Sequence, residues 1–187
     1  MTWQKFYERC IAEERKRWHK GSSLKDRAWY IGPFMVTTIF GRKGEDPYKT
    51  DVQLGSLALH IFWRGDADPD PHDHQHDFWT FPLVGYLEYV LGDQDEISLN
   101  EVKPYRLHAR KAEYRHRVER RLDGKPMTEI TFDVHKDGQT SIVKPLERRP
   151  IVTLVWRGRK RRDWGFWVRK EGAWEHVPWR AYIGRPT

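Results

Sequence analysis

The sequence predicts an all-β fold, a sandwich or barrel, preceded by one N-terminal helix, and three observations favour it. About ten short segments rich in aromatic and β-branched residues are separated by Gly, Pro, Asn and Asp at turn positions. Helical periodicity is confined to residues 2–20. The chain of 187 residues is only 38% hydrophobic, but its ten Trp, eight Tyr and eight Phe bury large areas. We therefore expect one domain over residues 1–187.

The N-terminal helix is expected within residues 1–21. Trp3 and Phe6 begin a series of apolar residues at spacings of three and four, with charged residues between them. Thr2 is a suitable N-cap, and Gly21 is a suitable C-terminal stop. We expect the apolar side of this helix to pack against the outside of a sheet.

The expected strands are bounded by turn residues. They are residues 28–40, 56–63, 78–84, 86–91, 97–102, 105–110, 114–118, 128–135, 140–143, 151–156 and 164–169. A bend is expected at residues 32–33, and residues 137–138 (Asp-Gly) predict a hairpin turn. Residues 42–50, which are punctuated by Gly and Pro, are expected as a loop, and residues 172–182 as a Trp-rich tail.

The chain carries a formal net charge of +7, which attracts anions, including nucleic acids. Most of the Lys and Arg residues are spread along the chain, which is typical of a solvated protein surface. One basic cluster, residues 157–162, is expected on a loop between two strands, and its candidates for anion binding are Arg157, Arg159, Lys160 and Arg161. It is either a solvated loop or an anion site where bases stack on nearby tryptophans, namely Trp156, Trp164 and Trp167.

The single cysteine, Cys10, excludes an intrachain disulfide and fits a reducing compartment. The first residues lack the apolar core of a signal peptide. The longest uncharged run, residues 28–41, is too short to cross a bilayer as a helix. The sequence therefore predicts a cytoplasmic protein that does not associate with membranes.

Residues 69–85, PDPHDHQHDFWTFPLVG, contain three of the nine histidines. His72, His74 and His76 alternate, so in an extended strand their rings share one face. Neutral imidazole is the commonest protein metal ligand. A hydrophobic run follows directly, which suggests a metal site at the mouth of a barrel. The alternative is a polar loop in which Asp73 stabilises a turn.

A third ligand is expected from another strand, because catalytic metal sites combine three protein ligands with an open position. His116 is the best candidate, since it follows His72 by about forty residues, past a hairpin, on an alternating strand. A structural role in the core is the alternative for His116.

This order, a His-x-His pair, a hairpin and a later single His, resembles the two motifs of the cupin superfamily. His72 and His74 match the pair of the first motif, Gly85 matches its closing glycine, and His116 matches the histidine of the second motif. The first motif also contains a glutamate ligand, and here Phe78 stands at its position.

Other positions depart from the family pattern. Gly65 lies one residue away from the expected first glycine, and Lys111 and Glu113 replace the proline and glycine of the second motif. The chain is more similar to uncharacterised cupin-like proteins of bacteria and phages, which share a His-Asp-His, a later His-Arg-Val and an Arg-x-Trp-Gly-Phe ending. That likeness covers residues 57–182, except for an inserted hairpin at residues 120–149.

The resemblance implies a cupin-type β-sandwich or barrel, a double-stranded β-helix, with one divalent transition metal (Fe, Zn, Ni or Mn). The implied ligands are His72, His74 and His116. Asp77 could replace the missing glutamate if the strand bulges. Asp73 is a candidate to orient a ligating histidine, and His76 either lines the pocket or is exposed.

Loss of the glutamate resembles the three-His cupins, some of which are iron dioxygenases acting on thiols. The first hypothesis is therefore a small-molecule metalloenzyme of the dioxygenase type. The second is a non-catalytic binding module for a small anionic ligand or nucleic acid. The third is a structural metal, with His76 or Asp77 as the fourth ligand. A homodimer is a further expectation, because cupin-like barrels often dimerise.

Overall fold

The computed structural model describes residues 2–18, 26–40, 47–66, 68–134 and 140–183, and it is mostly β with an N-terminal helix, as predicted. The helices are α1 (Trp3–Arg17) and α2 (Trp179–Ile183). The strands are β1 (Trp29–Ile31), β2 (Phe34–Phe40), β3 (Pro47–Leu54), β4 (Leu57–Phe62), β5 (His76–Pro82), β6 (Tyr86–Leu91), β7 (Ile97–Val102), β8 (His108–Arg110), β9 (His116–Arg121), β10 (Thr128–Val134), β11 (Thr140–Arg148), β12 (Ile151–Lys160), β13 (Gly165–Lys170) and β14 (Ala173–Pro178). The expected stop at Gly21 and the turn at residues 137–138 lie outside the described residues.

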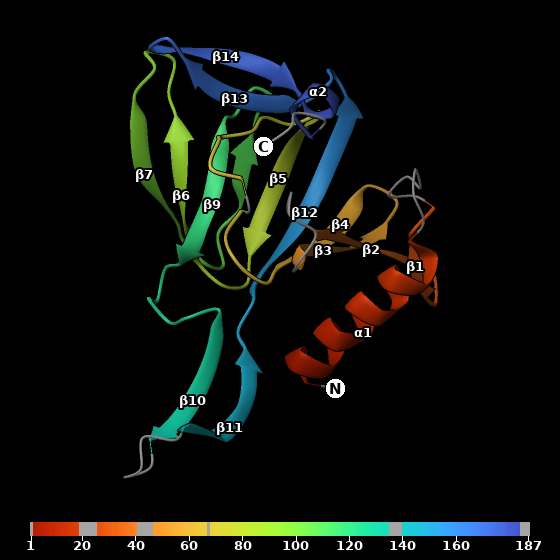
Figure 1. Ribbon diagram of the computed structural model, residues 1–187. Helices are drawn as coiled ribbons and strands as arrows, with labels where there is room; N and C mark the ends of the chain where they lie inside the picture. The colour runs from red at the N-terminus through yellow and green to blue at the C-terminus, as the bar shows by residue number, and fades with distance from the viewer. Residues whose placement is uncertain (1, 19–25, 41–46, 67, 135–139, 184–187) are drawn as a thin grey trace.

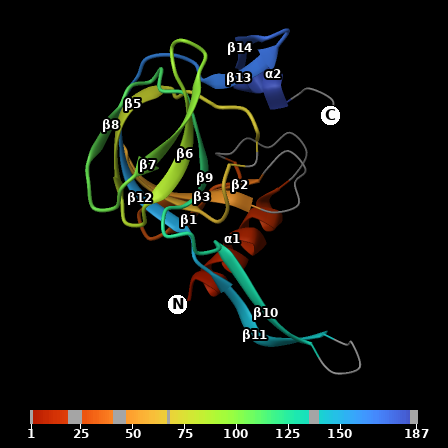
Figure 2. The same cartoon turned by 90° about the vertical axis from the view of Figure 1, so that its left-hand side faces the viewer.

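Two antiparallel sheets form the body of the protein. The larger has the strand order β1-β2-β3-β4-β12-β5-β8, and the smaller has the order β7-β6-β9. Figures 1 and 2 show the smaller sheet beside the β5–β12 part of the larger one. A core cluster joins the two sheets and consists of Phe62, Tyr86, Val102, Val118 and Ile151. This arrangement is a β-sandwich; the finer double-stranded β-helix stays a prediction.

Helix α1 packs on the outer face of the larger sheet, opposite the face that meets β6, β7 and β9. Thr2 caps it, because the Thr2 hydroxyl accepts a hydrogen bond from the Lys5 backbone N–H at 3.3 Å. Its buried Tyr7 and Cys10 join a second core cluster with Trp63 of the sheet, and the Tyr7 and Trp63 rings are 5.1 Å apart. The expected packing of this helix is confirmed.

One local prediction was wrong, and the structure adds detail to two others. Residues 47–50 belong to β3 rather than to a loop, because they pair with neighbouring strands of the sheet. Pro47 is tolerated at the first position of the strand, where a missing N–H costs least. Residues 28–40 form the β1–β2 hairpin around Gly32, whose φ of +56° suits a tight turn. The Trp-rich tail is ordered as β14 and α2.

Two hairpins extend the sandwich at opposite ends (Figure 1). The β10–β11 hairpin lies within the expected insertion at residues 120–149 and points away from the body. The β13–β14 hairpin and α2 lie across the other end and form their own cluster of Phe166, Val177 and Tyr182. None of the helices among the described residues is long and apolar enough to span a membrane.

Candidate metal centre

His72, His74 and His116 are brought together at the end of the sandwich that the β13–β14 hairpin covers. One nitrogen from each ring lies within 4.8 Å of the other two. The ring centroids are 5.3 Å apart for His72 and His74, 5.1 Å for His72 and His116, and 5.0 Å for His74 and His116. The three rings therefore surround one point almost symmetrically, and they are close enough to bind a single metal ion.

Backbone hydrogen bonds hold the histidine triad in this geometry. The segment before β5 pairs with the start of β9, since His72 N–H donates to the His116 carbonyl at 2.9 Å and His116 N–H donates back at 3.0 Å. His74 N–H donates to the Ala112 carbonyl at 2.9 Å. The bridge explains why residues about forty positions apart meet.

His74 shows most directly that the triad suits a cation. Its Nε2 atom is buried and has no hydrogen-bond partner in the described part of the chain. The Phe78 ring lies 4.5 Å from the His74 ring, so the position where a glutamate ligand was expected holds an apolar wall instead. A buried nitrogen without a partner is costly, and a metal ion would satisfy it.

Glu88, which the sequence reasoning missed, orients the third histidine. Its carboxylate is fully buried and accepts a hydrogen bond from His116 Nδ1 at 2.6 Å, so Nε2 is the nitrogen of His116 left for a ligand. Tyr114 donates its hydroxyl to Glu88 at 2.5 Å, Asn100 donates at 3.1 Å and Arg110 at 3.3 Å. The available signal was a lone acid within the otherwise uncharged strand of residues 86–91.

The Glu88 carboxylate stays ionised despite its burial. Burial alone would raise its pKa, but His116, Tyr114 and Arg110 outweigh that effect and lower the pKa to about 2. Burial has the opposite effect on the pKa of two triad histidines, His72 and His74. Burial lowers the pKa of His72 to about 4 and that of His74 well below its usual value. Neutral imidazoles with available lone pairs are the form that binds metals.

A pH dependence of stability follows from these shifts. His60, inside the same sandwich, has a pKa lowered to about 3, again first by burial. Unfolded histidines titrate near pH 6.5, so between about pH 6.5 and 4 the unfolded chain binds more protons than the folded chain. Stability in the presence of a chelator should therefore fall from pH 7 to pH 5, by roughly 1–2 kcal/mol for each such histidine.

Urea unfolding at the two pH values measures this change. Two buried glutamates do not change this expectation. The pKa of Glu88 is lowered, so the stability it contributes is lost only below about pH 4.5, outside this window. The pKa of Glu14 is raised, so its contribution to stability increases as the pH falls, but it is one group against several histidines. In the His60→Gln variant, about one proton fewer should be taken up on unfolding, so the free energy of unfolding should fall less steeply between pH 7 and pH 5. Equal stability at pH 5 and pH 7 would contradict the buried neutral state of these rings.

Asp73 lies between the two triad histidines in sequence, but it binds other partners. Its buried carboxylate accepts from the Gly165 N–H at 2.8 Å, pairs with Arg162 at 3.0 Å and lies 3.4 Å from His176 Nε2. A side chain at Gly165 would place its Cβ 2.3 Å from the Val177 carbonyl, so only glycine fits there. Asp73 thus fastens the β13–β14 hairpin to the histidine segment.

Asp77 and His76 are outside the triad. Asp77 accepts from the Ala112 N–H at 2.8 Å and pairs with Arg161 at 2.8 Å. The bond from Ala112, together with Arg161, lowers the pKa of Asp77. His76 begins β5 and is paired in register with Lys160 of β12. Neither belongs to the cluster that the structure brings within metal-binding distance.

Aromatic rings from the C-terminal hairpin close the site over His72. The Trp164 and Phe166 rings lie 6.1 Å and 5.9 Å from the His72 ring. Phe166 is stacked on Tyr182, whose hydroxyl donates to Asp70 at 2.8 Å. The tail therefore covers the triad and is fixed to the segment that carries it.

The basic cluster is placed differently from the expectation. Arg157 and Lys160 are on strand β12 rather than on a loop, and Arg157 donates to the Gln53 side chain at 2.8 Å. Lys160 pairs with Asp163 at 2.7 Å, while Arg159 is exposed. Of the expected stacking rings, Trp164 covers the triad, Trp167 lies under Arg115, and Trp156 is exposed.

A comparison with models of known protein families and a comparison with curated proteins each found no match to this chain. The cupin relationship therefore stays a prediction, and the case for function depends on the geometry of the triad.

Proposed function

We propose that this protein is a cupin-type metalloprotein whose His72, His74 and His116 hold one divalent transition metal, and that it acts on a small molecule as a dioxygenase-type enzyme. Fe, Zn, Ni and Mn all suit three neutral imidazoles. When bound, such a metal supplies Lewis-acid or redox chemistry at its remaining coordination positions.

One observation carries the proposal: three imidazoles, of which His116 is buried and His72 and His74 are half-buried, have ligand nitrogens within 4.8 Å of one another, and the buried His74 Nε2 atom has no hydrogen-bond partner in the described residues. A buried polar nitrogen is unfavourable unless something satisfies it. Glu88 satisfies only His116, and it does so at Nδ1, on the other side of that ring from Nε2. A cation between the rings accounts for all three.

Three ligands favour an open, catalytic site over a closed structural one. A structural site needs a fourth ligand, and the two candidates for it, His76 and Asp77, are outside the cluster. Asp77 is also occupied by Ala112 and Arg161. The charge of Lys49 acts on both His72 and His74, and a cation there would favour a polar or anionic substrate over an apolar one.

Elemental analysis of the protein purified without a histidine tag tests the proposal. We expect about one transition metal ion per chain. Removal by a chelator should leave a folded protein that rebinds the metal, since the sandwich has its own apolar core. A chain that is metal-free as purified and does not bind Fe²⁺ or Zn²⁺ would overturn the proposal. Unfolding on chelation would instead support the structural site.

A further inference from the structure

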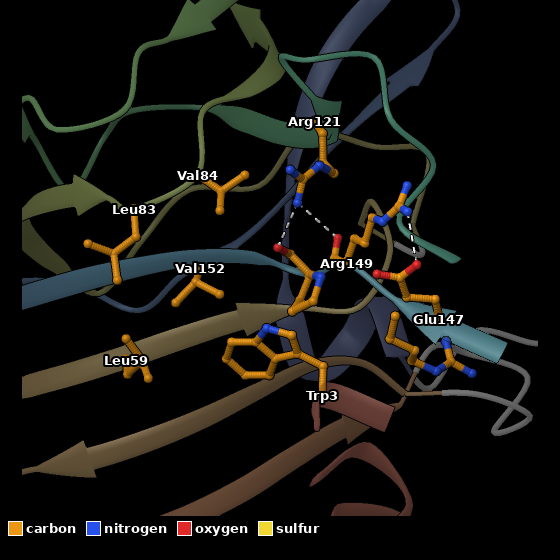
Figure 3. A pocket seen from close by; sticks show the side chains of 10 residues that line it. Trp3, Leu59, Leu83, Val84, Arg121, Glu147, Arg149 and Val152 are labelled. Atoms are coloured by element: carbon orange, nitrogen blue, oxygen red, sulfur yellow. Dashed lines mark hydrogen bonds and ion pairs between the residues drawn. The ribbon is translucent and has the colours of Figure 1, made fainter. Parts of the chain in front are cut away.

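Helix α1 covers only part of the outer face of the larger sheet. Its edge is marked by a cavity of about 380 Å³, in which Trp3 of α1 faces Leu59 and Val152 of the sheet (Figure 3). The arginines at its rim are occupied by other groups, because Arg121 donates to two backbone carbonyls and Arg149 pairs with Glu147. The cavity is therefore not an anion site. It lies where the part of the sheet covered by α1 meets the part that α1 leaves uncovered.

Beyond this border the same face of the sheet is apolar and exposed. One cross-strand row runs from Leu54 of β3 through Leu57 of β4 and Trp156 of β12 to Trp79 of β5. Trp156 is 59% exposed and Trp79 is 38% exposed. With Leu154, these residues form what we call the tryptophan face, and a hollow of about 240 Å³ lies in it. Contiguous exposed apolar surface of this kind marks an interaction site.

The tryptophan face has the geometry on which nucleic-acid bases stack. The Trp79 and Trp156 rings are 5.4 Å apart and inclined by 38°, and both project from the surface of a sheet. Leu107, in the segment before β8, lines the same hollow and is 68% exposed, and Tyr105, two residues earlier in the chain, is 70% exposed. Single-stranded nucleic acids bind such aromatic platforms on sheets, because every base has a face that can stack.

Charge around the tryptophan face favours a polyanion over a second copy of the chain. Arg106 lies between the exposed Tyr105 and Leu107, and Arg159 is exposed three residues after Trp156. The nearby carboxylates of Asp77 and Asp163 are already neutralised by cations. Two chains of charge +7 would bring these basic rims together, whereas phosphates complement them.

We infer that the tryptophan face binds single-stranded nucleic acid, with Trp79 and Trp156 stacking on bases and the basic rim contacting phosphates. This site is separate from the histidine triad, which lies between the sheets and under the C-terminal hairpin. It differs from the basic loop expected from the sequence, because only one of the three expected tryptophans, Trp156, takes part.

Fluorescence anisotropy with a fluorescein-labelled oligothymidine of about twelve nucleotides tests the inference. We expect binding at about 50 mM salt that weakens markedly by about 200 mM salt. Joint substitution of Trp79→Ala and Trp156→Ala should weaken binding at least about tenfold, and Trp156→Phe, which keeps a stacking ring, should weaken it less. The matched control is Trp18→Ala, which removes a 60% exposed tryptophan at the end of α1 and should leave binding unchanged.

Results of two kinds would overturn the inference, one from binding and one from self-association. One is a wild type that does not bind the oligonucleotide, or a double variant that binds it as tightly as the wild type does while its circular dichroism shows it folded. The other is light scattering that finds a dimer of the wild type and a monomer of the double variant, which would make the tryptophan face a self-association surface. A smaller salt dependence in Arg106→Ala with Arg159→Ala would support the phosphate contacts.

Discussion

Substitution of His74→Ala is expected to abolish stoichiometric metal binding while leaving the fold intact. The substitution removes one of three ligands and leaves His72 and His116, which alone cannot hold a transition metal tightly. It also removes the one triad nitrogen shown to be buried without a partner, which offsets part of the cost of the small cavity it creates. Metal affinity should therefore fall sharply, while the stability of the metal-free protein should change little.

A competition titration of Zn²⁺ against a chromophoric chelator measures the affinity. We expect a loss of more than about 100-fold, beyond the range found when groups behind a ligand are changed. The metal-free variant should unfold within about 1 kcal/mol of the metal-free wild type. His76→Ala is the matched control, because it removes a histidine of the same segment that lies outside the triad. Equal losses of metal affinity in the two variants would mean that binding depends on the segment around residues 72–76 in general rather than on the triad.

The sequence was sufficient to predict most of the strands and the three candidate ligands. Alternation indicated that His72 and His74 share a face, and alternation along residues 114–118 indicated His116 as the third ligand. The structure brings the three together, although residues 72–75 precede β5 rather than belonging to it. The strands at residues 86–91 and 97–102 were predicted to the residue, because both are bounded by strong turn signals. These features depend on residues close together in the chain, so they can be predicted from a single sequence.

The remainder depends on contacts between segments far apart in the chain. Asp73 and Asp77 looked like metal-associated groups from their neighbours, but their partners are Gly165, Arg161 and Ala112, which no spacing rule reveals. Residues 47–50 became a strand because β2 and β4 pair with them on both sides, and this overrides the local turn signal. The tryptophan pair is likewise a product of the β5–β12 register.

Glu88→Ala is expected to be the most destabilising single change at the site. The Glu88 side chain is 1% exposed and accepts from four donors, so its loss leaves the half-buried Arg110 charge and the Tyr114 hydroxyl without this acceptor. Removing one member of a buried ion pair costs about 3–5 kcal/mol. Chemical denaturation of the metal-free protein should show a loss of this size.

Glu88→Gln separates the structural role of this carboxylate from its role in orienting His116. The amide oxygen can still accept from His116 Nδ1, so the fold should be weakened less than in Glu88→Ala, but the negative charge behind the ligand is lost. Metal affinity should then fall about 10-fold or more, as when other carboxylates behind ligating histidines are neutralised. Glu101→Gln, on the exposed side of neighbouring β7, controls for the loss of one charge.

Tyr114→Phe completes the test of Glu88. This substitution removes one donor to the carboxylate, while the 2.6 Å hydrogen bond from His116 stays in place. If Glu88 orients His116 directly, Tyr114→Phe should lower stability by about 1 kcal/mol and change metal affinity little. If the whole buried network must be intact, the two substitutions should lower affinity alike. An affinity that neither Glu88→Gln nor Tyr114→Phe alters would restrict Glu88 to a structural role and leave the triad positioned by its backbone bridge alone.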